Sequence, residues 1–134
     1  MIKIIGLDGK EYKWHIGQYN RQRPVVSSGH GRARELLKEI FPTEIILEEL
    51  TLPGTGRSPL YADFYLNGPK LMVEVHGKQH FEYNQHYHGS IAGFMKSKAR
   101  DNKKFEWCEI NGIDLVILKD TDTDDRWREQ INGR

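Results

Sequence analysis

Two apolar segments joined by a four-residue turn constrain the fold of this chain more than any other feature of its sequence. The segments Leu60–Leu66 and Leu71–His76 are rich in branched and aromatic residues, and Asn67-Gly68-Pro69-Lys70 lies between them. Because these turn residues favour reversal of the chain, we expect the two segments to pair as an antiparallel hairpin. A turn of four residues then places Leu66 opposite Leu71.

The hydrophobic pattern predicts further elements on both sides of this hairpin. They are an N-terminal β-hairpin over residues 2–16 around Asp8-Gly9, a loop or mobile arm over 17–31, helices over 32–41, 91–110 and 124–131, and strands over 44–50 and 113–118. Helical spacing, Pro42 after the first helix and Asn111-Gly112 after the second support these bounds. The order is helix, three strands, helix, strand, helix, so we expect an α/β fold with a mixed sheet.

The length of the chain, 134 residues, suits a single domain. We expect residues 1–30 to form a hairpin and a basic arm, and residues 31–134 to form the core. Hydrophobic residues make up 37% of the chain and no apolar run is long enough to span a bilayer. Without a recognisable secretory signal, a cytoplasmic location is expected. The one cysteine, Cys108, excludes an internal disulfide or a thiolate zinc site.

Two acidic side chains lie at facing positions of the central hairpin. In the expected register Asp63 is opposite Glu74, and strand alternation puts Tyr61 and His76 on the same face. Facing carboxylates repel each other, and a divalent cation relieves the repulsion. Mg²⁺ or Mn²⁺ prefers oxygen ligands and can activate water to hydrolyse a phosphodiester. The residues alone also allow a shared proton or a bridging Lys or Arg.

The other face of this hairpin is expected to be the core face. It carries Ala62, Phe64, Leu66, Leu71, Val73 and Val75. On the helix expected over residues 91–110, one stripe at helical spacing contains Phe94, Lys98, Asp101, Phe105 and Cys108. Because two charges interrupt this apolar stripe, we expect Lys98 and Asp101 either to point toward the acidic pair or to form an ion pair at its edge.

Histidines crowd the end of the second strand of the hairpin and the segment that follows it. His76 and His80 flank the end of this strand and are the candidate proton-transfer groups, whereas His86 and His88 are expected to lie in a loop. A zinc site built from these histidines is the alternative, although their spacing does not specify one.

The net charge of +1 does not by itself indicate a nucleic-acid-binding protein, but the basic residues are clustered. Candidate contacts to DNA phosphates are Arg21, Arg23, Arg32, Arg34, Lys78 and Lys98. Because arginine forks suit phosphate oxygens, we expect the basic arm and the N-terminal hairpin to grip the backbone of DNA. Solvated helix faces are the alternative explanation of the same clusters.

The order of elements and several acidic residues resemble the PD-(D/E)XK nuclease superfamily. The similarity spans residues 31–118 and is strongest to the very short patch repair and EDxHD homing endonucleases, through Glu35, Asp63, the segment 73–80 with Glu74 and His80, and Asp101. The resemblance implies a restriction-endonuclease-like core and Mg²⁺-dependent nicking or double-strand cleavage of DNA. It also implies that Asp63 and Glu74 bind the metal, and that Glu35, His80 and Asp101 assist the chemistry.

Three residues depart from the pattern of this superfamily. His76 stands where lysine is usual, Ala62 stands where a proline often precedes the aspartate, and Glu35 lies opposite the apolar stripe of its helix. The alternatives to a DNA endonuclease are a non-catalytic DNA-binding protein with this fold and an RNA-cleaving nuclease. Double-strand cleavage by so small a chain would suit a homodimer.

Overall fold

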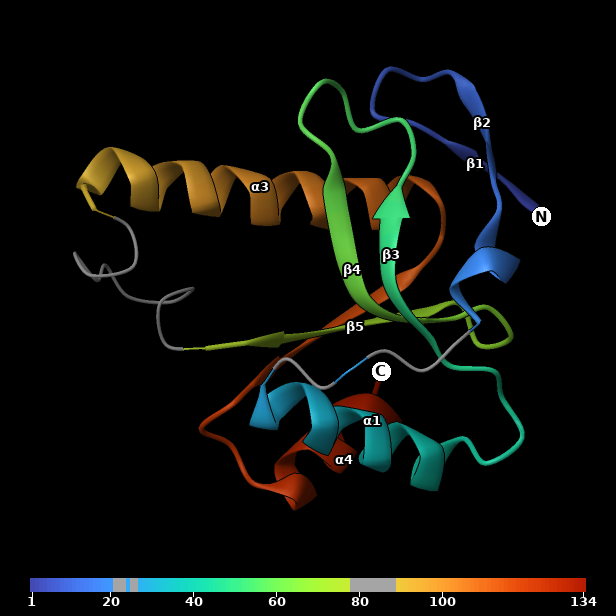
Figure 1. The fold of residues 1–134 in the computed structure, drawn as a ribbon, viewed down its shortest axis with the longest axis vertical. Helices are drawn as coiled ribbons and strands as arrows, with labels where there is room; N and C mark the ends of the chain where they lie inside the picture. The colour runs from blue at the N-terminus through green and yellow to red at the C-terminus, as the bar shows by residue number, and fades with distance from the viewer. Residues whose placement is uncertain (21–23, 25–26, 78–88) are drawn as a thin grey trace.

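The computed structural model describes residues 1–20, 24, 27–77 and 89–134, which form a mixed α/β fold (Figure 1). In chain order the elements are β1 (Ile2–Ile5), β2 (Glu11–Trp14), the 3-10 helix η1 (Ile16–Tyr19), α1 (Ser28–Ile40), β3 (Leu47–Leu52), β4 (Leu60–Leu66), β5 (Leu71–His76), α3 (Ile91–Ile110), β6 (Asp114–Lys119) and α4 (Asp124–Asn132). The predicted order of helix, three strands, helix, strand and helix is confirmed. In the described part of the chain, no helix is both long and apolar enough to cross a membrane.

The central sheet has four strands in the order β3-β4-β5-β6. β4 pairs antiparallel with both β3 and β5, whereas β6 runs parallel to β5. Leu66 lies opposite Leu71 and Phe64 opposite Val73, which confirms the register expected from the four-residue turn. The sheet is therefore mixed, as predicted, and the predicted hairpin supplies its two inner strands.

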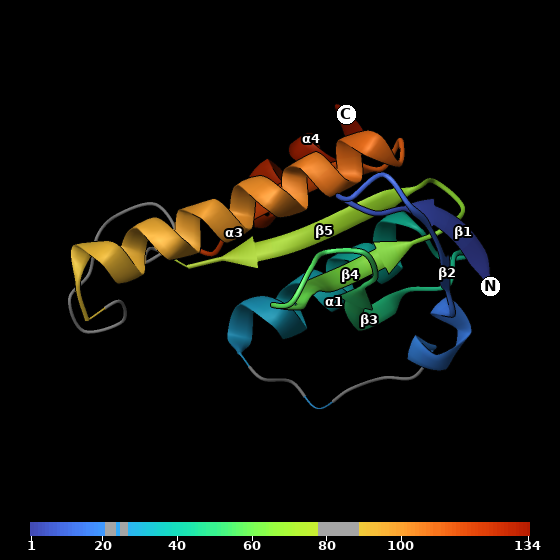
Figure 2. The same cartoon turned by 90° about the horizontal axis from the view of Figure 1, so that it is seen from above.

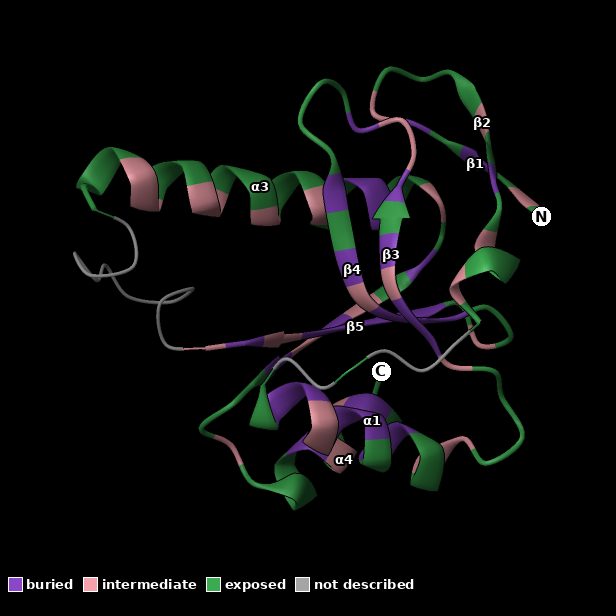
Figure 3. Ribbon diagram, viewed as in Figure 1, coloured by how far each residue is buried: buried purple, intermediate pink, exposed green. Residues whose placement is uncertain are grey.

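Helices and the N-terminal hairpin cover both faces of this sheet. α1 and α4 lie side by side on one face, whereas α3 and the β1–β2 hairpin lie on the other (Figures 1 and 2). The core under α1 and α4 includes Ala33, Leu37, Phe64, Val73, Leu118 and Trp127. The core under α3 and the hairpin includes Trp14, Leu50, Tyr65, Met72, Trp107 and Cys108. The inner strands are consequently buried along most of their length (Figure 3).

The prediction that the central hairpin has one core face and one polar face is therefore wrong in part. Tyr65 and Met72 are fully buried on the face that was expected to be polar. Ala62 belongs to the core under α3, and not to the core that holds Phe64 and Leu66. Because both faces are covered, the apolar residues do not alternate with polar ones, and the pattern does not distinguish the two faces.

The segment expected as a loop or mobile arm, residues 17–31, contains most of η1 and the first turn of α1. α1 begins four residues earlier than predicted because the Ser27 hydroxyl accepts the backbone N–H of His30 at 3.1 Å and caps the helix. Gly29 conceals this turn in the sequence, since glycine is a poor helix former. A Cβ at Gly29 would come within 2.9 Å of the Val75 side chain, so glycine allows α1 to approach β5.

The start of β3 differs from the prediction, whereas the N-terminal hairpin agrees with it. β3 begins at Leu47, three residues after the predicted start of its strand. The N-terminal hairpin is confirmed, with Gly9 in its turn at a φ of 80°. Asn111, at the end of α3, accepts the backbone N–H of Ile5 at 2.7 Å and donates to its carbonyl at 2.9 Å. The end of α3 thus holds the hairpin against the rest of the fold.

Candidate active site

Two carboxylates meet where β4 and β5 separate. The regular pairing of these strands covers Phe64–Leu66 and ends before Asp63. Beyond it, the backbone N–H of Asp63 donates to Glu74 Oε2 at 2.8 Å, and the backbone N–H of Val75 donates to Asp63 Oδ2 at 2.9 Å. The side chains replace the missing backbone hydrogen bonds, so each acid is fixed by the opposite strand.

Glu74 is the more deeply buried acid of this pair, with 2% of its surface exposed. Lys104 of α3 donates to Glu74 Oε1, and His76 Nε2 lies 3.9 Å from the same oxygen. Burial alone would raise the pKa of Glu74, but the bond with His76 and the charge of Lys104 outweigh it and lower the pKa below its ordinary value. Glu74 therefore remains ionised well below neutral pH.

Asp63 titrates in the opposite direction. Burial, followed by the negative charge of Glu74, raises the pKa of Asp63 to about 6. The pKa values of the two acids are thus shifted in opposite directions. Near neutral pH Glu74 is ionised, whereas the pKa of Asp63 lies within about one pH unit of neutral. Such divergence between neighbouring carboxylates is typical of functional sites.

The acidic pair lies in a cleft of about 290 Å³ between β4, β5 and α3. Its lining residues are Pro59, Leu60, Tyr61, Asp63, Glu74, Val75, His76, Ser97, Arg100, Asp101 and Lys104. Arg100 makes no hydrogen bond or ion pair with any residue that the structure describes. The cleft therefore combines ionised acids with cations from one helix, one of which is available to an anionic ligand.

The donor atoms of the cleft fit a hard divalent cation. The backbone N–H of Val75 binds Asp63 Oδ2, and none of the described backbone N–H groups binds Oδ1, so Asp63 can coordinate an ion, and Glu74 is held ionised within the same cleft. Mg²⁺ is commonly held by one or two carboxylates together with water and substrate phosphate. Among the described residues, no cluster of three or more His, Cys, Asp or Glu is arranged to hold a metal. The pair thus suits a magnesium-type ion that completes its coordination with water and phosphate.

α3 presents a different stripe to the cleft from the one predicted. Asp101 lines the cleft, as expected, but Phe105 is 57% exposed and Lys104 takes the inward position. Lys98 does not line the cleft, and its Nζ lies 5.8 Å from the centre of the Phe94 ring. The predicted stripe is therefore wrong at Phe105, where Lys104 takes the inward position, and is confirmed at Asp101, which lines the cleft, and at Cys108, which is buried.

Glu35 lies outside the cleft. Its side chain is 74% exposed on the outer face of α1, where it pairs with Lys38 at 3.6 Å. The exposure expected from its position in the helix is confirmed. The structure does not bring Glu35 to the acidic pair, so its assistance to the chemistry remains only what the resemblance implies.

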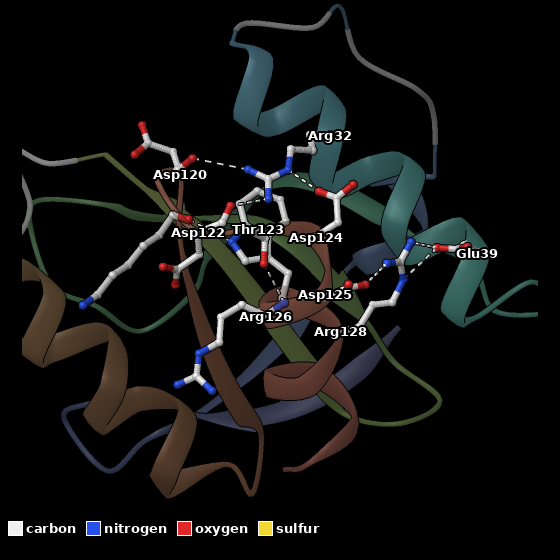
Figure 4. Close-up of polar contacts among 11 residues, drawn as sticks. Arg32, Glu39, Asp120, Asp122, Thr123, Asp124, Asp125, Arg126 and Arg128 are labelled. Atoms are coloured by element: carbon white, nitrogen blue, oxygen red, sulfur yellow. Dashed lines mark hydrogen bonds and ion pairs between the residues drawn. The ribbon is translucent and has the colours of Figure 1, made fainter.

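Arg32 is engaged in contacts within the protein. Its guanidinium lies 3.6 Å from the centre of the Trp127 ring, and it donates to the Asp124 carboxylate and to the carbonyls of Asp120 and Asp122 (Figure 4). These contacts tie α1 to α4 and to the loop between β6 and α4. A role in binding DNA would compete with all four of them.

Arg34 is buried, and it binds a carboxylate on the sheet. Its Nε and Nη2 donate to the two oxygens of Glu48 at 2.9 and 2.7 Å, and Glu48 Oε1 also lies 2.7 Å from His30 Nε2. His30 stacks on Phe64 with 4.6 Å between ring centres. This His30–Arg34–Glu48 cluster joins α1 to β3 on the face opposite the cleft, so Arg34 is not placed to contact a phosphate.

Four of the predicted site residues fall outside the described residues. They are the candidate phosphate contacts Arg21, Arg23 and Lys78 and the candidate proton-transfer group His80. The loop histidines His86 and His88 lie outside them as well. Their predicted roles stay predictions.

Sequence reasoning missed three residues of the cleft. Tyr61 was placed on the correct face but given no role, and Arg100 and Lys104 were not among the candidate contacts. The available signal was the spacing of four residues between Arg100 and Lys104, which puts both on one helix face. A competing stripe with two phenylalanines hid this signal, because apolar content is the usual guide to the inward face.

The chain is similar to three viral proteins. "Uncharacterized protein 033L" of Invertebrate iridescent virus 3 is 23% identical over 113 residues, covering 76% of this chain and 58% of the relative. "Uncharacterized protein 094L" of Frog virus 3 (isolate Goorha) is 28% identical over 120 residues, covering 87% and 77%. "Uncharacterized protein 307L" of Invertebrate iridescent virus 6 is 29% identical over 73 residues, covering 54% and 37%.

The matched region spans little more than half the length of the first of these relatives, at 58%. No protein-family model matches the chain, and no solved structure matches it. The names of the relatives state no activity. A function for this chain therefore has to be argued from the chemistry of the cleft.

Proposed function

We propose that this protein is a metal-dependent endonuclease that hydrolyses phosphodiester bonds in DNA. One observation carries the proposal: Asp63 and Glu74 come from adjoining strands and open into a cleft with cations on its wall. The Glu74 carboxylate is held by the backbone N–H of Asp63, and the Asp63 carboxylate by the backbone N–H of Val75. Hydrolysis of a phosphodiester needs a charged, positioned site for a divalent ion and for the anionic substrate, and this cleft offers both.

The side chains of the cleft have separable roles in this proposal. Asp63 and Glu74 would hold Mg²⁺ or Mn²⁺, which supplies Lewis-acid activation of the scissile phosphate and of the attacking water. Arg100, a cation of the cleft with no ionic partner in the part of the chain that the structure describes, would bind the phosphate. Lys104 keeps Glu74 ionised and supplies the permanent positive charge that His76 lacks. His76 would accept a proton from the attacking water or donate one to the leaving oxygen.

The proposal extends to the fold and its relationships. We infer that α1, β3–β5, α3 and β6 form a restriction-endonuclease-like core, similar to that of the very short patch repair and EDxHD branch of the PD-(D/E)XK superfamily. The order of these elements and the place of the two acids beside one another on β4 and β5 support the inference. The lysine of α3 would then compensate for the histidine in the Glu-x-His sequence of β5.

Cleavage of supercoiled plasmid in the presence of Mg²⁺ or Mn²⁺ tests the proposed function. The protein should yield relaxed or linear products, and Asp63→Asn and Glu74→Gln should lower the rate by more than about 100-fold, since loss of even outer-shell partners of a metal costs 10–100-fold. Glu106→Gln, which removes an exposed acid of α3 outside the cleft, is the matched control. Equal cleavage by all four proteins would show that another site, or a contaminant, cuts the DNA.

A non-catalytic DNA-binding protein is the second candidate, and one observation favours it. Lys104 already neutralises Glu74, so the acidic pair is partly compensated without a metal ion. This candidate predicts that DNA binding is independent of Mg²⁺ and that no cleavage product forms.

Cleavage of RNA is a separate alternative, because the chemistry of the cleft does not depend on the sugar of the substrate. Parallel digestion of labelled DNA and RNA of the same sequence distinguishes DNA cleavage from RNA cleavage.

A further inference from the structure

Tyr61 is an exposed aromatic residue on the wall of the cleft. It lies on β4 opposite Thr51 of β3, two residues before Asp63, and 56% of its surface is exposed. Its hydroxyl makes no hydrogen bond with any described residue, so local polar contacts do not explain a large ring at this place. Pro59 and Leu60 line the cleft beside it and add apolar surface.

The opposite wall of the cleft is cationic. Arg100 and Lys104 lie one turn apart on α3, and Arg100 has no ionic partner among the described residues. Two residues of a strand span about 7 Å, and side chains two residues apart point to the same face, so the backbone positions of Tyr61 and Asp63 are about 7 Å apart on the face that lines the cleft. An aromatic wall, a cationic wall and an acidic floor therefore surround a space in which a base and its phosphate could be held apart.

We propose that this cleft binds one unpaired nucleotide of a DNA strand, with its base stacked on Tyr61 and its phosphate bound by Arg100 beside the acidic pair. The inference rests on the proposed function for the identity of the ligand as DNA, and it adds the class of substrate. Aromatic side chains bind successive bases of single strands in this way, with little preference for sequence.

The size of the cleft and the stacking geometry favour an unpaired strand over a duplex. A volume of about 290 Å³ is at the lower end of the range for sites that hold one small molecule, so it accommodates one nucleotide unit and not two paired strands. In a duplex the faces of each base are covered by its neighbours, and a base reaches a protein ring only after it leaves the stack. The substrate is then single-stranded DNA, or DNA with a locally unpaired base.

Stacking can be measured with an oligonucleotide that carries one 2-aminopurine, a fluorescent base that is quenched when an aromatic ring stacks on it. The protein is titrated into the single strand and into the matching duplex, in EDTA and again in Ca²⁺, so that the readout does not require cleavage. We expect quenching with the single strand. Tyr61→Ala should abolish the quenching and weaken binding by about tenfold or more, whereas Tyr61→Phe should retain both.

The matched control is Phe105→Ala, which removes an equally exposed aromatic ring, 57% exposed, that lies outside the cleft on the same protein. It should leave the quenching unchanged. The inference is wrong if no quenching occurs in either buffer, if Tyr61→Ala quenches as the wild type does, or if the duplex binds better than the single strand. Quenching that depends on Tyr61, without cleavage in Mg²⁺, would support this inference and contradict the proposed function. Cleavage in Mg²⁺ without quenching that depends on Tyr61 would support the proposed function and contradict this inference.

Discussion

Among the residues that the structure describes, two glutamates are buried, and they have opposite surroundings. Glu48 and Glu74 are 3% and 2% exposed, and each lies near a histidine and a basic side chain. At Glu48 the guanidinium of Arg34 bonds to both oxygens and His30 bonds to one of them, in a cluster closed by Phe64. At Glu74 a second acid lies alongside, and the pair opens into a cleft.

The difference between the two glutamates indicates that a buried carboxylate is suited to bind a ligand when its neighbours do not fully satisfy its charge and its hydrogen-bonding capacity. Arg34 satisfies Glu48 with the planar fork that matches a carboxylate, so this ion pair serves as a tie between α1 and β3. Lys104 offers a single ammonium to one oxygen of Glu74, and Asp63 adds a negative charge that no guanidinium of the described residues pairs with. Stability is therefore expected to depend on the Glu48 cluster, and ligand binding on the Glu74 cluster.

The largest expected effect on stability is that of Glu48→Ala. It leaves the buried Arg34 guanidinium without its partner, and the free energy of unfolding should fall by about 3–5 kcal/mol. Urea denaturation followed by circular dichroism measures the loss. Glu106→Ala, on the exposed face of α3, should change the unfolding free energy by less than about 0.5 kcal/mol. A loss at Glu48 no greater than that of the control would contradict the structural role of the cluster.

Asp63→Asn is expected to stabilise the metal-free protein at neutral pH. The pKa of Asp63 in the folded state, about 6, exceeds the ordinary value of 3.8, so wild-type stability falls as the pH rises from about 4 to about 6. Asparagine avoids this loss and can still accept the N–H of Val75. The variant should be more stable by about 3 kcal/mol at pH 7 in EDTA and no more stable below pH 4. Equal free energies of unfolding for the two proteins from pH 4 to pH 7 would contradict an unfavourable burial of the ionised Asp63 carboxylate beside Glu74.

Lys104→Met should move the pH dependence of cleavage to higher pH. The charge of Lys104 lowers the pKa of both Asp63 and Glu74, so its removal makes both acids harder to ionise. A displacement of about one pH unit in the rate profile is expected. Lys103→Met removes the neighbouring exposed lysine and should leave the profile in place. A profile lowered uniformly, without displacement, would assign Lys104 to phosphate binding alone.

The smallest expected effect is that of Glu35→Gln. Its side chain is exposed and paired only at a distance of 3.6 Å with Lys38, and surface pairs of this kind contribute little. Neither cleavage nor stability should change by more than about twofold or 0.5 kcal/mol. A large loss of cleavage with normal stability would restore Glu35 to the chemistry and would mean that DNA binding brings α1 to the cleft.

The sequence was sufficient for the order of elements and for the meeting of Asp63 with Glu74. Both follow from local signals, namely turn residues, helical spacing and the length of the turn after Leu66. It was insufficient for the burial of Tyr65 and Met72, because helices distant in the chain cover both sheet faces. The inward position of Lys104 in place of Phe105 was also beyond it, since this position depends on the charge of Glu74, which only tertiary contact brings near.

The most direct test is the binding of Mn²⁺ to the protein, followed by electron paramagnetic resonance of the free ion. If Asp63 and Glu74 share one divalent cation, the wild-type protein should remove about one ion per chain from solution. Asp63→Asn and Glu74→Gln should each lose that site, whereas Glu106→Gln should retain it. Mn²⁺ binding of unchanged stoichiometry and affinity in both cleft variants would contradict a shared ion at the acidic pair.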